Sequence, residues 1–358
     1  MSSIPLLPGI TSRMVATSRI TQHVRLSGPD DGTPVLFVHG NNSCATFWEE
    51  TMLALPAGFR AIAPDLRGYG DTEFQPVDAT RGTRDFADDI LALADALHME
   101  RFHVVGHSLG GSVVWALLAA APDRLLTVTL AAPGSPYGFG GTKDIEGTPC
   151  WPDCAGSGGG LVNQEFAQRE AAQDRSTTNP LTAPRVVMNN YYWKPPFRPA
   201  REEELLSGLL SIKVRPDHHP GDMLPSPNWP GIAPGVFGPN NALSPKYVGD
   251  IPARILTAAS KPPILWVHGA DDQIVSDQSL LELGTLGKLG VMPNWPGEAI
   301  FPPQPMKRQT RSFLQRYETN GGRFVELELA ACGHTPYLEH PESFNRAFHA
   351  HLAMRHSA

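Results

Sequence analysis

The stretch FHVVGHSLGGSVVWALLAAAPD, residues 102–123, decides the fold class. Its first part is a run of β-branched and aromatic residues typical of a buried strand, and a helical run follows directly. Between the two lies the pattern Gly106-x-Ser108-x-Gly110. A serine at such a junction lies on a sharp turn that glycine neighbours permit, with its hydroxyl at the carboxyl end of the strand. Because the chain has 34 glycines, the pattern indicates a nucleophile only through its position between strand and helix.

Strands and helices alternate on both sides of this stretch. Further buried strands are expected at residues 34–39, 59–65, 125–133, 262–269 and 323–330, and helices at residues 45–55, 83–99, 307–320 and 341–353. The strands are nearly continuous in Val, Ile and Leu, which indicates that both faces of the sheet are covered. We therefore predict an α/β fold with a mostly parallel central sheet flanked by helices.

The alternation stops in the middle of the chain, where proline and glycine are frequent and only short helical pieces are expected, at residues 163–174 and 202–212. A structureless loop of that length is implausible inside a compact domain, so we predict an inserted cap or lid. The predicted division is a core of residues 1–133 and 262–358, a cap of residues 134–261, and a second insert in the core at residues 287–305.

Composition excludes several classes of protein. The 358 residues are 41% hydrophobic and carry a formal net charge of −7, without a basic stripe, which argues against nucleic-acid binding. No apolar run approaches the length of a membrane span, and no export signal is recognisable, so a cytoplasmic location is expected. Four cysteines do not make a disulfide framework, although Cys150 and Cys154 are close enough in sequence to cross-link.

A serine hydroxyl needs a general base, and the base needs a hydrogen-bond acceptor that fixes its tautomer. His334, in ACGHTPYLEHPESF, lies in the loop after the last expected strand, on the same edge of the sheet as Ser108. His107 flanks the serine on the wrong side of the turn, and His39 is expected to brace the loop after its own strand. His334 is therefore the predicted base.

Three aspartates follow the strand before the last one. They are Asp271, Asp272 and Asp277 in ILWVHGADDQIVSD, residues 264–277. A carboxylate projecting from this loop would meet the far side of His334. The residues alone make this loop the source of the acid.

Five segments carry a resemblance to a known family: FVHGNNS, PDLRGYGDT, VVGHSLGG, WVHGADDQIV and GHTPYLEHPESF. Over residues 20–133 and 262–355, the chain resembles the α/β-hydrolase fold superfamily in its capped serine-hydrolase branch. The resemblance implies a triad of Ser108, Asp272 and His334 and no metal or organic cofactor.

Details of the core also follow from the resemblance. The family pattern G-x-x-D-x-x-V selects Asp272 as the acid, which leaves Asp271 as a turn residue and Asp277 as an expected N-cap for QSLLELG. Asp65 and Arg67 of PDLRGYGDT are expected to be structural.

The resemblance also implies an oxyanion hole built from two backbone N–H groups. One belongs to Leu109, and the other to Asn41, with Asn42 as the alternative.

A serine nucleophile argues against epoxide hydrolases and haloalkane dehalogenases, which have the same fold and an aspartate nucleophile. The leading prediction is hydrolysis of a small-molecule carboxylic ester or lactone through an acyl-enzyme. The alternatives are a carbon–carbon bond hydrolase, a cofactor-free perhydrolase, and a receptor-like ligand-binding protein. The sequence does not indicate an oligomeric state.

The cap is expected to set the substrate. Its candidate pocket residues are Trp151, Tyr191, Trp193 and Trp229. Trp295 of the second insert and Asn42, in the loop after the first core strand, are added to them. They favour a hydrophobic or aromatic substrate, unless the rings only form the cap's own core. The segment RPDHHPGD (215–222) offers a conceivable metal cluster of Asp217, His218, His219 and Asp222, which we interpret instead as a solvated loop.

Overall fold

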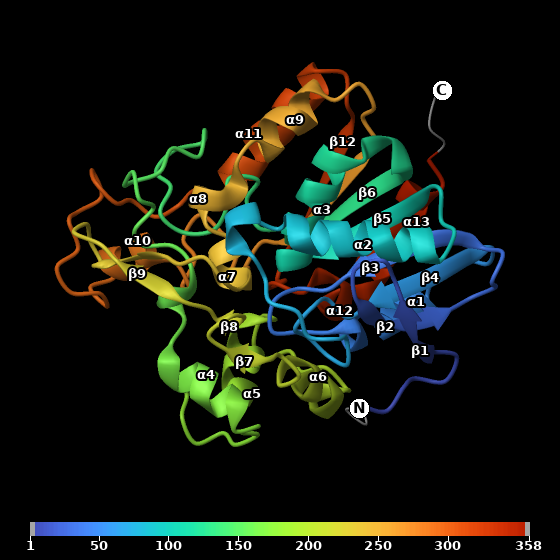
Figure 1. Ribbon diagram of the computed structural model, residues 1–358, viewed down its shortest axis with the longest axis horizontal. Coiled ribbons are helices and arrows are strands. Elements are labelled where there is room, and N and C mark those ends of the chain that lie inside the picture. The colour runs from blue at the N-terminus through green and yellow to red at the C-terminus, as the bar shows by residue number, and fades with distance from the viewer. Residues whose placement is uncertain (1–3, 355–358) are drawn as a thin grey trace.

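The computed structural model describes residues 4–354 and contains an eight-stranded sheet, whose labelled strands lie in the right half of the view in Figure 1. The strand order is β1-β2-β4-β3-β5-β6-β11-β12. The strands are β1 (Thr11–Ala16), β2 (Thr21–Ser27), β3 (Thr33–Val38), β4 (Phe59–Pro64), β5 (Phe102–His107), β6 (Leu125–Ala131), β11 (Ile264–Gly269) and β12 (Phe324–Leu329). All pairs from β4 to β12 are parallel, which confirms the predicted α/β class with a mostly parallel sheet.

Strands β1 and β2 form an antiparallel hairpin that the sequence pattern did not predict. Strand β1 lies at the edge of the sheet, and five of its six residues are exposed. Such a strand has no buried face, so it carries no hydrophobic alternation by which it could be recognised.

Helices cover both faces of the sheet, as the apolar strands predicted. On one face lie α2 (Arg84–Ala96), α3 (Leu109–Ala120), α9 (Ile251–Thr257) and α11 (Met306–Thr319). On the other lie α1 (Glu49–Leu53), α12 (Pro336–Glu339) and α13 (Pro341–Leu352). Each face of the sheet carries its own apolar core. Successive residues of β5 point to opposite faces, so Val104 packs in the core on the first face and Val105 in the core on the other. The segment expected as one helix at residues 45–55 is a 3₁₀ turn, η1 (Ala45–Trp48), followed by α1.

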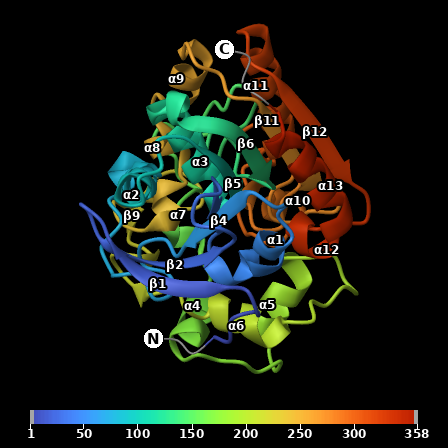
Figure 2. The same cartoon turned by 90° about the vertical axis from the view of Figure 1, so that its right-hand side faces the viewer.

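The chain between β6 and β11 contributes nothing to the eight-stranded sheet within residues 4–354. It forms two small sheets and several short helices. These elements are η4 (Gly159–Leu161), α4 (Gln164–Ala171), α5 (Pro184–Tyr191), α6 (Glu202–Leu209), β7 (Val214–Arg215), β8 (His219–Pro220), β9 (Met223–Pro225), β10 (Ile232–Pro234), α7 (Pro239–Ala242) and α8 (Pro245–Val248). Helices α4, α5 and α6 lie together at one end of the molecule, opposite α9 and α11, in both views (Figure 1 and Figure 2).

The end of this segment packs with the core. Ile251 and Ile255 of α9 belong to the same apolar cluster as Trp115 of α3 and Phe313 of α11. The division into core and cap at residue 261 stays a prediction. After β11 comes α10 (Leu283–Lys288), and the two remaining 3₁₀ turns are η2 (Ala79–Arg81) and η3 (Pro122–Arg124).

Two further expectations concern the whole chain. All four cysteines are free thiols, so Cys150 and Cys154 are not cross-linked in this structure. Across the described residues, no helix combines the length and the apolarity that a membrane crossing requires.

Candidate active site

Ser108 lies on a sharp turn between β5 and α3. Its backbone has φ 54° and ψ −117°, a conformation that a non-glycine residue adopts only under strong local constraint. A Cβ on Gly106 would overlap the carbonyl of Gly110, and a Cβ on Gly110 would overlap the carbonyl of Val38. Both glycines are therefore required for the close packing that holds the serine in this position.

The structure brings His334 and Asp272 together. Nδ1 of His334 lies 2.9 Å from Oδ2 of Asp272. The other carboxylate oxygen of Asp272 accepts hydrogen bonds from the N–H groups of Ile274 (2.8 Å) and Val275 (3.0 Å). The Asp272 side chain is fully buried, so these bonds fix the direction in which it presents Oδ2.

The loops that carry these two residues touch each other. A Cβ on Gly269 would overlap the carbonyls of Cys332 and Gly333, so glycine is needed where the loop after β11 meets the loop after β12. This close approach explains how an aspartate and a histidine far apart in the chain form a hydrogen bond.

His107 connects His334 to the turn that carries Ser108. Its Nε2 lies 2.9 Å from the carbonyl oxygen of His334, and the two imidazole centres are 4.7 Å apart. Burial, together with the proximity of His334, holds the pKa of His107 well below its usual value, so His107 is a neutral N–H donor here. His334 thus lies beside the residue that precedes Ser108.

The other two aspartates of the acidic loop have structural contacts. Asp271 is half exposed and forms an ion pair of 2.8 Å with Lys194 of the predicted cap. Asp277 accepts hydrogen bonds from the N–H groups of Lys307 (2.9 Å) and Arg308 (3.2 Å), so it caps α11. The expectation that it caps a helix in QSLLELG is wrong, because the next helix begins only at Leu283 and has Glu282 as its N-cap.

The loop after β3 adjoins the serine. A Cβ on Gly40 would lie 3.0 Å from the Cβ of Ser108, so the following residue, Asn41, is at the serine turn. Leu109 is the first residue of α3, a position whose N–H has no acceptor within the helix. Asn41 and Leu109 thus both adjoin Ser108.

The side chains of the two asparagines point to different partners. Asn41 Oδ1 accepts a hydrogen bond from the Tyr69 hydroxyl at 2.6 Å. Asn42 has a positive φ of 46°, and its amide donates to Glu170 on α4. His39 braces this loop as expected, since its Nε2 accepts from the N–H of Leu66 at 2.9 Å.

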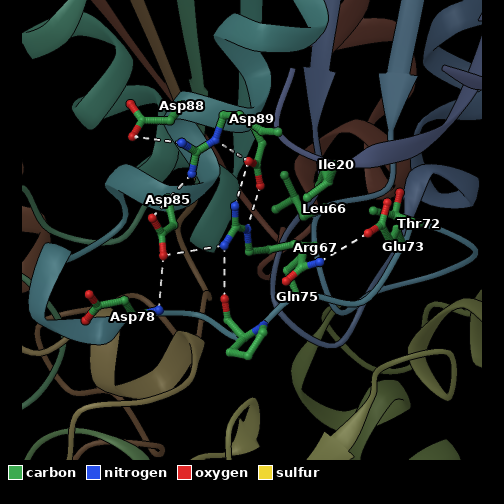
Figure 3. A network of polar contacts seen from close by, with 12 residues as sticks. Ile20, Leu66, Arg67, Thr72, Glu73, Gln75, Asp78, Asp85, Asp88 and Asp89 are labelled. Carbon is green, nitrogen blue, oxygen red and sulfur yellow. Dashed lines mark hydrogen bonds and ion pairs between the residues drawn. The ribbon is translucent and has the colours of Figure 1, made fainter. Parts of the chain in front are cut away.

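The segment PDLRGYGDT has the structural role expected of it. Asp65 accepts from the N–H of Ala45 at 2.8 Å and contacts Nδ1 of His23 at 2.8 Å. Arg67 makes a two-pronged ion pair with Asp89 of α2, at 2.6 and 2.7 Å, inside a network that Asp85 extends (Figure 3).

Three of the rings predicted for the substrate pocket are packing residues. Trp193 is 1% exposed, stacks edge-on with Tyr192 and Phe197, and belongs to the second apolar cluster. Trp229 packs on Phe301, and the Trp295 indole donates to the Phe301 carbonyl, so both rings hold the second insert. Tyr191 is half-buried against the same apolar cluster, and Trp151 is half-buried. Asn42 is buried against Glu170, away from open solvent.

The segment RPDHHPGD does not form a cluster. Asp217 pairs with Arg215, His219 with Glu170, and Asp222 accepts from the N–H groups of Val236 and Phe237. Among residues 4–354, no group of three His, Cys, Asp or Glu side chains could hold a metal ion. The expectation of a solvated loop is wrong for the two histidines, His218 and His219, which are buried.

The sequence did not predict three contacts with the loop after β3, which are made by Tyr69, Glu170 and Tyr192. Tyr192 was expected only as one of the aromatic rings of the cap. Glu170 and Tyr192 lie in the predicted cap, in segments without a recognisable motif. Only tertiary contacts identify them.

The chain belongs to the α/β hydrolase fold family, whose model matches residues 33–296. It is similar to epoxide hydrolase 2 of Siraitia grosvenorii, with 36% identity over 31% of this chain and 35% of that protein. It is also similar to 2-hydroxymuconate semialdehyde hydrolase of Pseudomonas sp. strain CF600, with 33% identity over 28% of this chain and 36% of that protein. The chain thus matches about a third of the length of these curated relatives.

Solved structures share the fold over nearly the whole chain. A carboxylesterase from Bacillus subtilis superposes with a TM-score of 0.58 at 18% identity, covering 98% of this chain and 93% of that one. A serine hydrolase from Cycloclasticus zankles gives a TM-score of 0.60 at 15% identity, covering 95% and 97%. At such identities the likeness concerns the fold.

Proposed function

We propose that the protein is a serine hydrolase that cleaves a small carboxylic ester or lactone. The observation that carries this proposal is the Ser108 turn beside a histidine that is hydrogen-bonded to a buried aspartate. A neutral hydroxyl becomes a useful nucleophile at ordinary pH only with such a base.

In the proposed reaction, His334 takes the proton of Ser108 as the serine oxygen bonds to the substrate carbonyl carbon. The carbonyl oxygen becomes an oxyanion that accepts from the N–H groups of Leu109 and Asn41. His334 then gives its proton to the leaving alkoxide, and the bond to that oxygen breaks. Water, deprotonated by His334, attacks the acyl-enzyme, releases the acid and restores Ser108.

Asp272 supports each step by accepting from Nδ1 of His334. Its 2.9 Å contact holds the tautomer that leaves Nε2 free to accept a proton, and its charge stabilises the imidazolium. In the proposed reaction, Ser108 is the nucleophile, His334 the base and Asp272 the acceptor that orients it.

Some relatives are named epoxide hydrolases, but Ser108 stands where those enzymes are expected to have aspartate. A second candidate function is hydrolysis of a carbon–carbon bond next to a carbonyl. It is favoured by the similarity to 2-hydroxymuconate semialdehyde hydrolase, and it would use the same three residues. For either reaction we propose a hydrophobic or aromatic substrate, covered by the segment of residues 134–261, in a cytoplasmic enzyme.

The test is turnover of p-nitrophenyl esters of increasing chain length, of a lactone panel and of a vinylogous diketone, by wild type and by Ser108→Ala. Ser112→Ala is the matched control, since Ser112 is buried in α3 and its hydroxyl has no partner among the described residues. We expect loss of turnover in the first variant only. Activity that survives Ser108→Ala would refute the assignment, and diketone cleavage without ester cleavage would favour the second candidate.

A further inference from the structure

A buried carboxylate of the cap is hydrogen-bonded to the loop that follows β3. Glu170 of α4 is fully buried, and one of its oxygens accepts from the side-chain amide of Asn42. Its other oxygen lies 2.8 Å from Nε2 of His219, which is 1% exposed. Asn42 is the residue directly after the proposed oxyanion donor Asn41.

A second cap residue holds the backbone of the same position. The Tyr192 hydroxyl donates to the carbonyl of Asn42 at 2.9 Å. The carbonyl of Tyr192 in turn accepts from the hydroxyl of Thr335 at 2.7 Å, directly after His334. The cap therefore contacts both the oxyanion loop and the loop of the base.

The conformation of Asn42 needs such support. Its φ of 46° lies in the left-handed region, which asparagine tolerates better than most residues but which still costs energy. With the side chain held by Glu170 and the carbonyl by Tyr192, the peptide unit on either side of Asn42 has little freedom. The Asn41 backbone is fixed as a consequence.

Burial of the Glu170 carboxylate lowers the folding stability, because the charged group loses its hydration. It raises the pKa of Glu170, while His219 and Asn42 act in the opposite direction by favouring the charged form. An apolar side chain would pack at this position without that cost. The Glu170–His219 pair is therefore better explained by the orientation it gives to Asn42 than by a contribution to folding stability.

We propose that Glu170 is a positioning residue of the reaction: through Asn42 it fixes the Asn41 N–H against the oxyanion that forms at Ser108. This inference rests on the proposed function, because it assigns a role to Glu170 only if an oxyanion forms. The cap then contributes to the chemical step itself and not only to substrate choice.

A positioning role has a kinetic signature. A donor that acts on the oxyanion stabilises the transition state more than bound substrate, so its displacement lowers kcat and leaves KM nearly unchanged. Glu170→Ala is expected to lower kcat by about 10- to 100-fold, less than full loss of an oxyanion donor. Glu170→Gln should retain most of kcat, because its amide oxygen still accepts from Asn42. Its amide nitrogen can donate to Nε2 of His219 once the imidazole carries its proton on Nδ1, which reverses the direction of the wild-type hydrogen bond.

A second variant tests the same link from the other side. Asn42→Gly removes the side chain while permitting the positive φ, so it should reproduce the loss of kcat, and the double variant Glu170→Ala/Asn42→Gly should lose no more than either single one. Glu282→Ala is the matched control, because Glu282 is also a fully buried carboxylate but caps α10. It should lower the melting temperature and leave kcat unchanged.

The affinity for a trifluoromethyl ketone of the best ester substrate, which forms an oxyanion on Ser108, should fall by the same factor as kcat/KM. The affinity for the product carboxylate should not change. A Glu170→Ala enzyme with wild-type kcat, or one in which only KM rises, overturns this inference alone. A wild-type protein that neither hydrolyses acyl substrates nor reacts with a fluorophosphonate at Ser108 overturns the proposed function as well.

Discussion

His334 and Asp272 are joined by a contact of 2.9 Å between Nδ1 and Oδ2, and neither side chain is more than 3% exposed. Water therefore does not compete for this bond, and the carboxylate has its second oxygen engaged by two backbone N–H groups. The imidazole is held in one tautomer and one orientation.

Asp272→Asn should lower kcat by about 10³- to 10⁴-fold, since the amide nitrogen would face Nδ1 and favour the wrong tautomer. Asp271→Asn is the control, because it removes only an exposed ion pair with Lys194, which is worth at most about 1 kcal/mol. Steady-state kinetics and circular dichroism of both variants provide the measurement. If Asp271→Asn proves the more damaging substitution, Asp272 is not the acid.

Asp277→Ala should destabilise the protein by about 1 kcal/mol through loss of the cap of α11. Asp277 accepts from the N–H groups of Lys307 and Arg308 and pairs with the Arg308 guanidinium at 3.0 Å. Urea denaturation monitored by fluorescence measures the change. Because the cap is a hydrogen bond, Asp277→Asn should recover more than half of the loss; a fully destabilised Asn variant would show instead that the charge matters most.

The core of this fold was predictable because its signals are local. Residues 102–123 contain a strand, a turn and a helix in one continuous stretch, and the structure has β5, Ser108 and α3 in that order. The loops that carry Asp272 and His334 were also recognisable, since each directly follows a strand rich in apolar residues. Parallel strands then bring these loops to the same edge of the sheet.

The contacts that were not predictable join distant segments. Glu170 lies 128 residues from Asn42 in sequence, and nothing in its surroundings marks it as different from an exposed helical glutamate. Asp277 looks like the cap of the residues that follow it, yet it caps a helix 30 residues further on. In both cases the side chain's partner is set by how loops pack, which periodicity does not report.

The ion-pair network around Arg67 predicts a large loss of stability when Asp89 is replaced by alanine and a small loss when its neighbour Asp88 is replaced. Asp89→Ala should cost about 3–5 kcal/mol, because it leaves the buried Arg67 guanidinium without its main partner. Asp88→Ala should cost about 1 kcal/mol or less, since the Asp88 side chain is one-third exposed. Chemical denaturation compares the two. Equal losses would contradict this distinction between the buried and the exposed carboxylate.

The lowered pKa of His351 predicts how the free energy of unfolding depends on pH. It is buried on α13, and burial lowers its pKa from 6.5 to about 4. The unfolded chain therefore binds a proton between these values while the folded protein does not, so stability is complete above pH 6.5 and is lost as the pH falls towards 4. The contribution at pH 4 is about 3 kcal/mol. His351→Gln should flatten the fall of the unfolding free energy between pH 6.5 and 4, measured by urea titration, whereas His98→Asn, at an exposed position, should not. An unchanged slope in His351→Gln would mean that other groups dominate the acid sensitivity.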